Sequence, residues 1–269
     1  MQDLIPQLRE LYPRAEIIVV NDASTDRTPD IAEQGGARVV THPYCMGNGA
    51  AIKTGVRAAT GEIVVLMDAD GQHDPKDIVA LLERVEQGFD MVVGARDRGS
   101  HASKGRWVAN SFYNWFASWV TGQNILDLTS GFRAARTEKF RQFLHLLPNG
   151  FSYPTTITMA FLRAGYPVTY VGIKARRRIG KSHIKLLRDG VRFLLIVFRV
   201  GTLYSPLKVF VPVSASFFLL GIAYYIFTFI TADRFTNMSA LLLVTSVIVF
   251  MIGLVSEQIT LLNYRDRSN

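Results

Sequence analysis

Residues 63–75 read IVVLMDADGQHDP, and this stretch decides the fold. Five consecutive apolar residues, 63–67, predict a strand that is buried on both faces, as in a parallel sheet. The strand ends in three carboxylates, Asp68, Asp70 and Asp74, which are separated by small or turn-forming residues. Because ligands bind at the carboxyl ends of parallel strands, we interpret this end as the edge of a binding site.

The stretches around this strand alternate between short apolar strands and helical segments. In residues 75–86 the apolar side chains recur at helical spacing, whereas the strands are short runs rich in Val and Ile. The alternation predicts an α/β domain with a mostly parallel sheet and helices on both faces. The predicted strands are 16–20, 37–41, 62–67 and 91–94, and the predicted helices are 28–34, 49–59 and 75–86.

The end of the chain is too apolar for an ordinary soluble enzyme. Of 269 residues, 49% are hydrophobic and 19% charged, and neither 209–230 nor 238–256 contains a charged residue. Each run approaches the ~20 apolar residues that a membrane-spanning helix needs. We predict a hairpin of two spanning helices, 209–230 and 239–261, with a pair of buried core helices as the alternative.

The basic residues gather immediately before this hairpin. The net charge is +8, and ten Lys and Arg side chains lie between Lys174 and Lys208 against one Asp189. Nucleic acid would suit such a patch, but next to a hairpin we interpret it as a cytoplasmic flank that binds lipid headgroups. We therefore expect no nucleic-acid partner, a multi-pass protein of the cytoplasmic membrane, and both termini in the cytoplasm. Residues 184–203 are basic on one side and apolar on the other, which predicts an interfacial helix.

A second amphipathic helix is predicted at residues 107–120, WVANSFYNWFASWV. This segment holds six aromatic residues and no charged one. Packing in the domain core and contact with a membrane interface both fit the pattern, and the sequence leaves the choice open. The single Cys45 excludes an internal disulfide and fits a reducing compartment.

Asp68 and Asp70 need a compensating charge, because two carboxylates this close repel each other. A divalent cation with hard oxygen ligands, Mg²⁺ or Mn²⁺, would supply it, and a solvated turn is the alternative. We interpret Asp74, placed before Pro75, as a helix N-cap. Phosphatases of the haloacid dehalogenase type also carry Asp-x-Asp after a strand, but Gln72 stands where their pattern has Thr or Val.

Six stretches resemble, in order and spacing, the motifs of inverting family 2 glycosyltransferases. The resemblance is to the polyprenyl-phosphate branch, which includes the dolichol-phosphate mannosyltransferase group and undecaprenyl-phosphate glycosyltransferases. It covers about residues 10–185, implies a GT-A (Rossmann-like) fold, and fits the subset with two C-terminal transmembrane helices. The stretches are 18–26 (IVVNDASTD), 48–55 (NGAAIKTG), 65–73 (VLMDADGQH), 93–96 (VGAR), 127–133 (DLTSGFR) and 179–182 (IGKS).

The resemblance also implies a role for each matched residue. A helix cap for Asp26 and a solvated position for Lys53 remain alternatives. Asp127 is the candidate for a general base or for a carboxylate that orients the acceptor. The implied nucleotide-sugar ligands are Asp22, Asp26, Lys53, Asp68 and Arg96; the metal ligands Asp68, Asp70 and Gln72; the acceptor-phosphate ligands Arg133, Arg178 and Lys181; and the catalytic residues Asp70, Asp127 and Arg133.

The implied reaction transfers a sugar from a UDP- or GDP-sugar to a polyprenyl phosphate at the cytoplasmic membrane face, with inversion and with Mg²⁺ or Mn²⁺. A GT-A enzyme with another acceptor and an inactive membrane-bound homologue are the alternatives. A processive polysaccharide synthase is disfavoured, because the Gln-x-x-Arg-Trp motif is absent and the spans are too few. The sequence does not specify the sugar, the nucleotide or the polyprenol, and it permits a homo-oligomer.

The sequence divides into four parts. They are a GT-A domain at 1–183, an interfacial region at 184–207, a transmembrane hairpin at 208–262 and a cytoplasmic tail at 263–269. Family members carry an additional first strand before a helix similar to the one that we predict near residues 2–11. We expect that strand to be missing here, and a chain that starts at Met1 to transfer sugar slowly or not at all.

Overall fold

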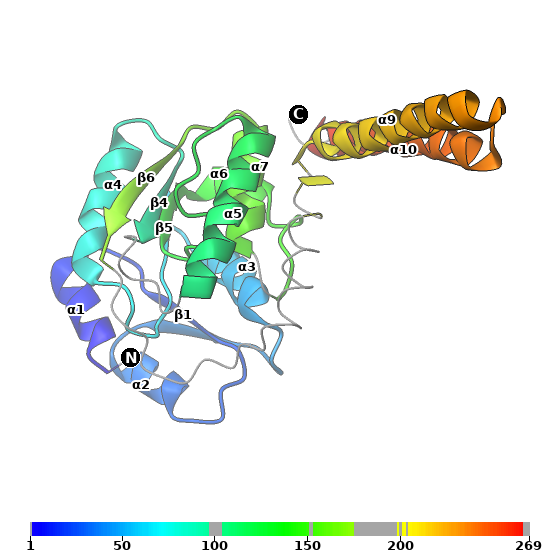
Figure 1. Ribbon diagram of the computed structural model, residues 1–269. Coiled ribbons are helices and arrows are strands. Elements are labelled where there is room, and N and C mark those ends of the chain that lie inside the picture. Colours follow the sequence, from blue (N-terminus) through cyan, green and yellow to red (C-terminus); the bar gives the residue numbers. More distant parts are fainter. Residues whose placement is uncertain are drawn as a thin grey trace. The chain divides into compact units, whose positions relative to one another are not determined.

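The computed structural model describes residues 2–96, 104–150, 153–174, 198, 201–202 and 204–265, with backbone alone at 104–110 and 263–265. Contacts divide the chain into two units, one made of 1–116 with 123–185 and the other of 117–122 with 186–269. The first unit holds all of the strands described, and the second holds the two long C-terminal helices (Figure 1). The elements are α1 (Leu4–Leu11), β1 (Ile18–Asn21), α2 (Thr28–Gln34), β2 (Arg38–Thr41), α3 (Asn48–Ala58), β3 (Ile63–Leu66), the 3₁₀ helix η1 (Pro75–Asp77), α4 (Ile78–Glu86), β4 (Met91–Arg96), α5 (Lys104–Thr121), β5 (Arg133–Arg136), α6 (Thr137–Gln142), α7 (Tyr153–Arg163), β6 (Val168–Ile173), α9 (Pro206–Ala232) and α10 (Asn237–Arg265).

The strands form two separate sheets. β1 pairs with β2 in parallel, and the second sheet has the order β3-β5-β4-β6. Within it β4 and β6 are parallel, but β5 runs antiparallel to both of its neighbours, β3 and β4. The predicted α/β fold is present, with a more mixed sheet than expected, since two of the four strand pairings described are antiparallel. The antiparallel strand was not predicted, because β5, with the sequence RAAR, lacks the β-branched residues that mark a strand.

β3 also lies elsewhere than predicted. We expected a strand buried on both faces, as in a parallel sheet, whereas β3 is an edge strand with the antiparallel β5 as its partner. Its side chains are nevertheless covered, because Val64 and Leu66 are buried and Ile63 and Val65 pack against the core cluster around α4. An edge strand can be as apolar as a central one when other elements cover both of its faces.

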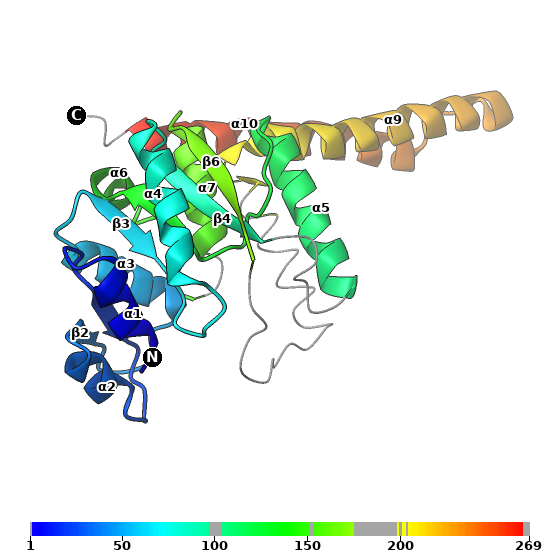
Figure 2. The same ribbon diagram turned by 90° about the vertical axis from the view of Figure 1, so that its left-hand side faces the viewer.

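Helix α4 covers one face of the four-stranded sheet, and α6 and α7 lie on the other (Figures 1 and 2). Ile78, Leu81 and Val85 project from α4 into a cluster with Val92 and Phe132, as the helical spacing predicted. Full burial of each such side chain stabilises the fold by roughly 1.5–3 kcal/mol. The predicted N-cap is confirmed, since Asp74 Oδ1 accepts a hydrogen bond from the amide of Lys76 at 3.1 Å.

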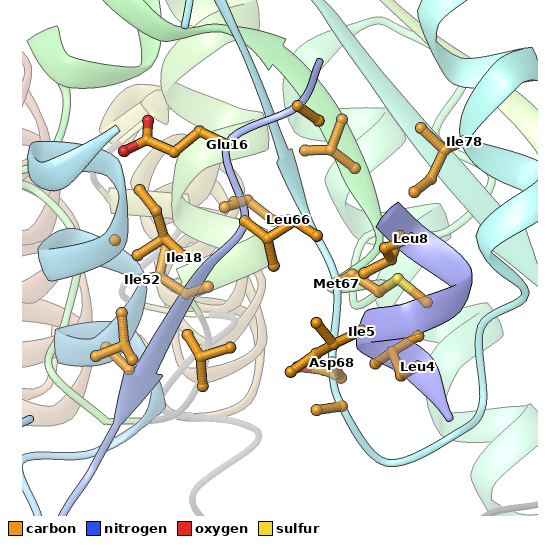
Figure 3. Close-up of a pocket in the computed structure, with 18 of the residues that line it drawn as sticks. Leu4, Ile5, Leu8, Glu16, Ile18, Ile52, Leu66, Met67, Asp68 and Ile78 are labelled. Carbon is orange, nitrogen blue, oxygen red and sulfur yellow. The ribbon is translucent and has the colours of Figure 1, made fainter. Parts of the chain in front are cut away.

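A pocket of about 500 Å³ separates the two sheets. Its walls are the edge of β1, the edge of β3 and the apolar face of α1 (Figure 3). In Figure 3 both strands run the same way, from Glu16 toward Ile18 on one side and from Leu66 toward Asp68 on the other. Asn21 and Asp68, at the ends of these strands, are among the residues that line the pocket.

The second unit is a helical hairpin. Within the described residues, Pro206–Ala232 and Asn237–Leu262 are long and apolar enough to cross a membrane. The two helices pack closely, because a Cβ on Gly221 would lie 3.0 Å from Leu243, and Ser214 Oγ donates a hydrogen bond to the carbonyl of Ser246 at 2.8 Å. Glu257 Oε2 accepts a hydrogen bond at 3.4 Å from the amide of Leu207, so this carboxylate pairs with the first turn of α9.

Candidate active site

Asp68 and Asp70 follow β3 at one end of the four-stranded sheet, and both are half-buried. Gly71 makes the turn with a φ of +77°, and Asp70 Oδ1 accepts a hydrogen bond from the amide of Gln72 at 3.2 Å. A Cβ on Gly131 would lie 2.9 Å from Asp68 Oδ2, so the loop that precedes β5 touches this carboxylate. Loops that are far apart in the sequence thus meet at Asp68.

These two carboxylates suit a divalent cation that arrives with a ligand. Among the described residues there is no group of three His, Cys, Asp or Glu side chains that could hold a metal ion by itself. Mg²⁺ in phosphate-handling sites typically uses one or two carboxylates and takes its remaining ligands from phosphate oxygens and water. Asp68 and Asp70 provide that number of carboxylates, so the donor set fits a metal diphosphate.

The carboxylate of Asp22, directly after β1, organises the loop that follows β2. It accepts hydrogen bonds at 2.8 Å from His42 Nδ1 and from the amides of Met46 and Gly47, and one at 3.2 Å from Cys45 Sγ. Burial raises the pKa of Asp22, but the bonds from His42 and the two amides outweigh it and hold that pKa well below its usual range. Asp22 is therefore an anion whose lone pairs are largely taken by its own protein.

The Arg96–Asp127 pair lies where β4 ends. Arg96 Nε lies 2.8 Å from Asp127 Oδ2 and the guanidinium also reaches Oδ1 at 3.0 Å, a two-point geometry that fixes both side chains. Asp127 Oδ1 accepts three more hydrogen bonds, from the amide and hydroxyl of Thr129 and from the amide of Ser130, each at 3.1 Å. Burial raises the pKa of Asp127, but the hydrogen bonds from Arg96 and the amides outweigh burial. The net pKa lies below its usual value, so this carboxylate stays ionised.

Arg133, the first residue of β5, is completely buried. Its guanidinium donates to the carbonyl of Pro154 and to Thr158 Oγ1, both at 3.1 Å, and to the carbonyl of Ser130. Burial lowers the pKa of this group, but a guanidinium with an ordinary pKa above about 12 remains charged at neutral pH. The cation thus ties the loop around Ser130 to the start of α7.

Residues 1–144 match the model of glycosyl transferase family 2, and residues 205–262 match the GtrB C-terminal hairpin. The chain belongs to glycosyl transferase family 2. The first match covers β1 to β5 with both acidic strand ends, and the second covers the hairpin of α9 and α10.

Two relatives of this family 2 protein have names that include a lipid phosphate. A dolichyl-phosphate hexose transferase from Haloferax volcanii is 31% identical, with 66% of this chain and 77% of the relative aligned. An undecaprenyl-phosphate mannosyltransferase from Micrococcus luteus is 30% identical, with 65% of this chain and 78% of the relative aligned.

Solved structures show the same GT-A fold. Glucosyl-3-phosphoglycerate synthase from Mycobacterium tuberculosis, in complex with Mn²⁺ and UDP-glucose, aligns with a TM-score of 0.57 over 73% of this chain and 74% of its own. The sequence identity is 24%, so the likeness extends to the fold. The two-sheet core with its acidic strand ends is therefore the glycosyltransferase domain of this family 2 protein.

Several predicted site residues make contacts that differ from those expected. Arg133 makes its hydrogen bonds to groups of its own protein and is 0% exposed, so in this arrangement it does not face a phosphate. Asp127 is bound by Arg96, which leaves its lone pairs poorly placed to accept a proton from an acceptor. Lys53 donates to the carbonyl of Leu147 at 3.2 Å and to Asn149 Oδ1, and thereby joins α3 to the loop after α6.

Asp26 is exposed and accepts a hydrogen bond from the amide of Thr28 at 3.0 Å, as a residue at a helix start does. Gln72 contributes its amide to the turn after Asp70, and its side chain is half-buried. Arg178 and Lys181, predicted to bind the acceptor phosphate, lie outside the described residues, as does most of the predicted interfacial region at 184–207.

Two residues at the site were not predicted. His73 is buried and its ring stacks on Phe132, with centroids 4.9 Å apart, so it anchors the acidic turn to the sheet. Gly131 matters because a Cβ at this position would lie 2.9 Å from Asp68 Oδ2, so a larger residue requires one of the two to shift. The resemblance placed both residues inside matched stretches, but only the three-dimensional packing assigns them a contact.

Proposed function

We propose that this protein transfers a sugar from a nucleotide-diphosphate donor to a polyprenyl phosphate at a membrane surface, with inversion at the anomeric carbon. The observation that carries the proposal is the combination, in one chain, of a family 2 domain and a GtrB-type hairpin with two candidate membrane spans. A lipid acceptor gives such a hairpin a purpose, since it keeps the catalytic domain where its substrate resides. The named relatives that use dolichyl and undecaprenyl phosphates support the same class of acceptor.

The donor is proposed to bind at the strand ends. Asp68 and Asp70, with Gln72 in the same turn, would hold Mg²⁺ or Mn²⁺, which neutralises charge that builds up on the departing diphosphate. Asp22 holds the 42–47 loop, and we propose that this loop forms one wall of the nucleotide site. Arg96, which is 26% exposed and fixed by Asp127, is the described cation best placed to meet a donor phosphate.

A phosphate acceptor also suits the state of Asp127. An alcohol nucleophile needs a base to take its proton, whereas a lipid phosphate is already anionic and attacks through an oxygen without losing a proton. That oxygen forms the new bond to the anomeric carbon while the bond to the nucleoside diphosphate breaks on the opposite face. We propose that Asp127 is a positioning residue for Arg96 and that Arg178 and Lys181 bind the acceptor phosphate.

We further propose the division into a GT-A domain at 1–183, an interfacial region at 184–207, a hairpin at 208–262 and a tail at 263–269. The basic residues between Lys174 and Lys208 support a cytoplasmic location for the domain and both termini, by the positive-inside rule.

Labelled transfer to lipid tests the function. Membranes that contain the full chain would be incubated with radiolabelled UDP- and GDP-sugars, Mn²⁺, and undecaprenyl or dolichyl phosphate, with Asp70→Asn membranes as the matched control. Slow transfer, as expected without the first strand, would still place label in an organic-extractable, acid-labile lipid above the control. Label in a water-soluble or protein product would contradict the acceptor, and no transfer together with no donor binding would contradict the function.

A further inference from the structure

One side of α5 exposes large aromatic side chains. Phe112 is 50% exposed, Trp115 is 61% exposed and Trp119 is 44% exposed. Spacings of three and four residues place the three on one face of the helix. Tyr113, Ala117 and Val120 are buried on the other side at 2%, 1% and 0%, so the core side of α5 is already filled by other residues. We call the face of Phe112, Trp115 and Trp119 the aromatic face.

Two rings of the aromatic face are in contact, since the Phe112 and Trp115 centroids lie 5.7 Å apart. Leu126, 55% exposed, belongs to a loop that Asn114 of α5 binds. Aromatic rings in water cost free energy, and a contiguous exposed apolar patch is typical of a surface that meets a protein or a membrane.

The C-terminal end of α5 is bonded to the hairpin. Lys208 Nζ donates a hydrogen bond at 2.8 Å to the carbonyl of Val120, in the last turn of α5. Lys208 is the third residue of α9, where the candidate membrane span begins. A lysine at the end of a spanning helix lies at the level of the lipid headgroups. The turn of α5 that carries Trp119 is thereby held at that level.

We propose that the aromatic face of α5 lies in the boundary between lipid headgroups and acyl chains. Tryptophan is enriched at this depth, because its ring is apolar while its indole N–H reaches the wet headgroup layer. Lys208, at the start of the candidate span, bonds the turn of α5 that carries Trp119. The net charge of +8 favours a bilayer that contains anionic lipid.

Lipid contact at this helix would reach the active site through Asn114. The Asn114 side chain donates from Nδ2 to the carbonyl of Leu126 at 2.7 Å and accepts at Oδ1 from the amide of Leu128 at 3.1 Å. It thus holds both neighbours of Asp127. Under the proposed function, a helix seated in lipid fixes the Arg96–Asp127 pair relative to the surface that presents the acceptor phosphate.

Tryptophan fluorescence can read this helix alone, because all three tryptophans, Trp107, Trp115 and Trp119, belong to α5. The full chain would be reconstituted in vesicles of phosphatidylcholine and phosphatidylglycerol, with and without lipids brominated near the headgroup end or near the tail end of the acyl chain. Two single-tryptophan proteins, W107F/W119F and W107F/W115F, separate Trp115 from Trp119.

We expect bromine near the headgroup end to quench Trp115 and Trp119 at least about twofold more than bromine near the tail end, and aqueous acrylamide to quench both weakly. Weak bromolipid quenching with strong acrylamide quenching would place the face in water. Protection from both quenchers would mean that a second copy or another protein covers it. Either result overturns the proposal.

A second variant guards against misfolding of the single-tryptophan proteins. In F112S/W115S, which retains Trp107 and Trp119, we expect bromolipid quenching to fall while the thermal unfolding midpoint changes little, because the Phe112 and Trp115 side chains are exposed. Unchanged quenching would count against the aromatic face. Neither readout requires sugar transfer, so this inference and the proposed function can fail separately.

Discussion

Two kinds of carboxylate stand at the strand ends of this glycosyltransferase domain. Asp22 and Asp127 each accept at least four hydrogen bonds from their own protein, which keeps both ionised and fixes their loops. Asp68 is half-buried and touches the backbone at Gly131. No residue in the described part of the chain donates a hydrogen bond to its carboxylate. The difference separates carboxylates that build the site from carboxylates that present oxygen atoms to a ligand.

The largest expected effect comes from a carboxylate that presents oxygen atoms to a ligand. Asp70→Asn removes a hard anionic ligand, so we expect transfer to fall by on the order of 100-fold or more, since a metal ion stabilises several kcal/mol of developing charge. The free energy of unfolding should change by less than about 1 kcal/mol, because Asp70 is half-buried. Turnover with excess Mn²⁺ and thermal unfolding measure the two quantities. A large loss of stability would erase the contrast with Asp127.

Asp127→Asn should have the opposite balance of effects, with a large loss of stability. The substitution leaves the Arg96 guanidinium partly buried without its counter-charge and turns an amide N–H toward the Thr129 and Ser130 donors. We expect a loss of stability on the order of 3 kcal/mol, accompanied by lower activity.

The Asp127 role is checked with a double-mutant cycle. Arg96→Met in the Asp127→Asn background should cost much less stability than it does alone. Full activity with normal donor affinity in Asp127→Asn would show that the carboxylate has no role in the reaction, and lost activity at unchanged stability would instead favour a general base.

Gly131→Ala probes the contact between Asp68 and the loop that follows Asp127. The new Cβ would lie 2.9 Å from Asp68 Oδ2 and 3.2 Å from the Tyr153 hydroxyl, so one of them must move. Overpacking of this kind typically costs about 1–3 kcal/mol, and we expect about tenfold slower transfer with a raised Mn²⁺ requirement. Metal titrations of the rate test this, with Gly150→Ala as a control at a glycine without a positive φ whose added Cβ would meet no atom within 4 Å. Equal metal requirements in Gly131→Ala and wild type would show that Asp68 is not a metal ligand.

The smallest effect concerns Cys45. The hydrogen bond to Asp22 and the negative charge of that carboxylate raise the pKa of the thiol, so the wild-type thiol is a poor nucleophile near neutral pH. Asp22→Asn should therefore speed alkylation of Cys45 by iodoacetamide a few-fold at pH 8. Because the chain has one cysteine, mass spectrometry of the whole protein reads the rate directly. An unchanged rate would mean that Asp22 does not hold the 42–47 loop in solution.

The predictions from sequence succeeded where a local pattern carries the information. Apolar runs and helical spacing located β1 to β4, α2, α3 and α4, and the Asp-Pro pair located the helix start at Asp74. β5 could not be found, because Ala134 and Ala135 are small enough for any secondary structure. Its antiparallel insertion between β3 and β4 then made the sheet mixed.

The site was predicted as a set of residues and less well as a set of contacts. Asp68 and Asp70 follow a strand, and that position alone marks them as ligand-facing. The burial of Arg133 was not predicted, since arginine is expected at the surface unless partners are present, and its partners Pro154 and Thr158 lie more than twenty residues away. The ring of donors around Asp22 depends on a loop more than twenty residues downstream in the same way.

The turn of the hairpin bears on how the membrane unit is inserted. Asp233, in the left-handed conformation that ends α9, and Arg234 are the charged residues between Val209 and Ser256, and they carry opposite signs. An electric field does work of about 2.3 kcal/mol on each charge that crosses 100 mV, and for this pair the two contributions cancel. Insertion of the hairpin should therefore be insensitive to membrane voltage, with the apolar surface of α9 and α10 as its source of free energy.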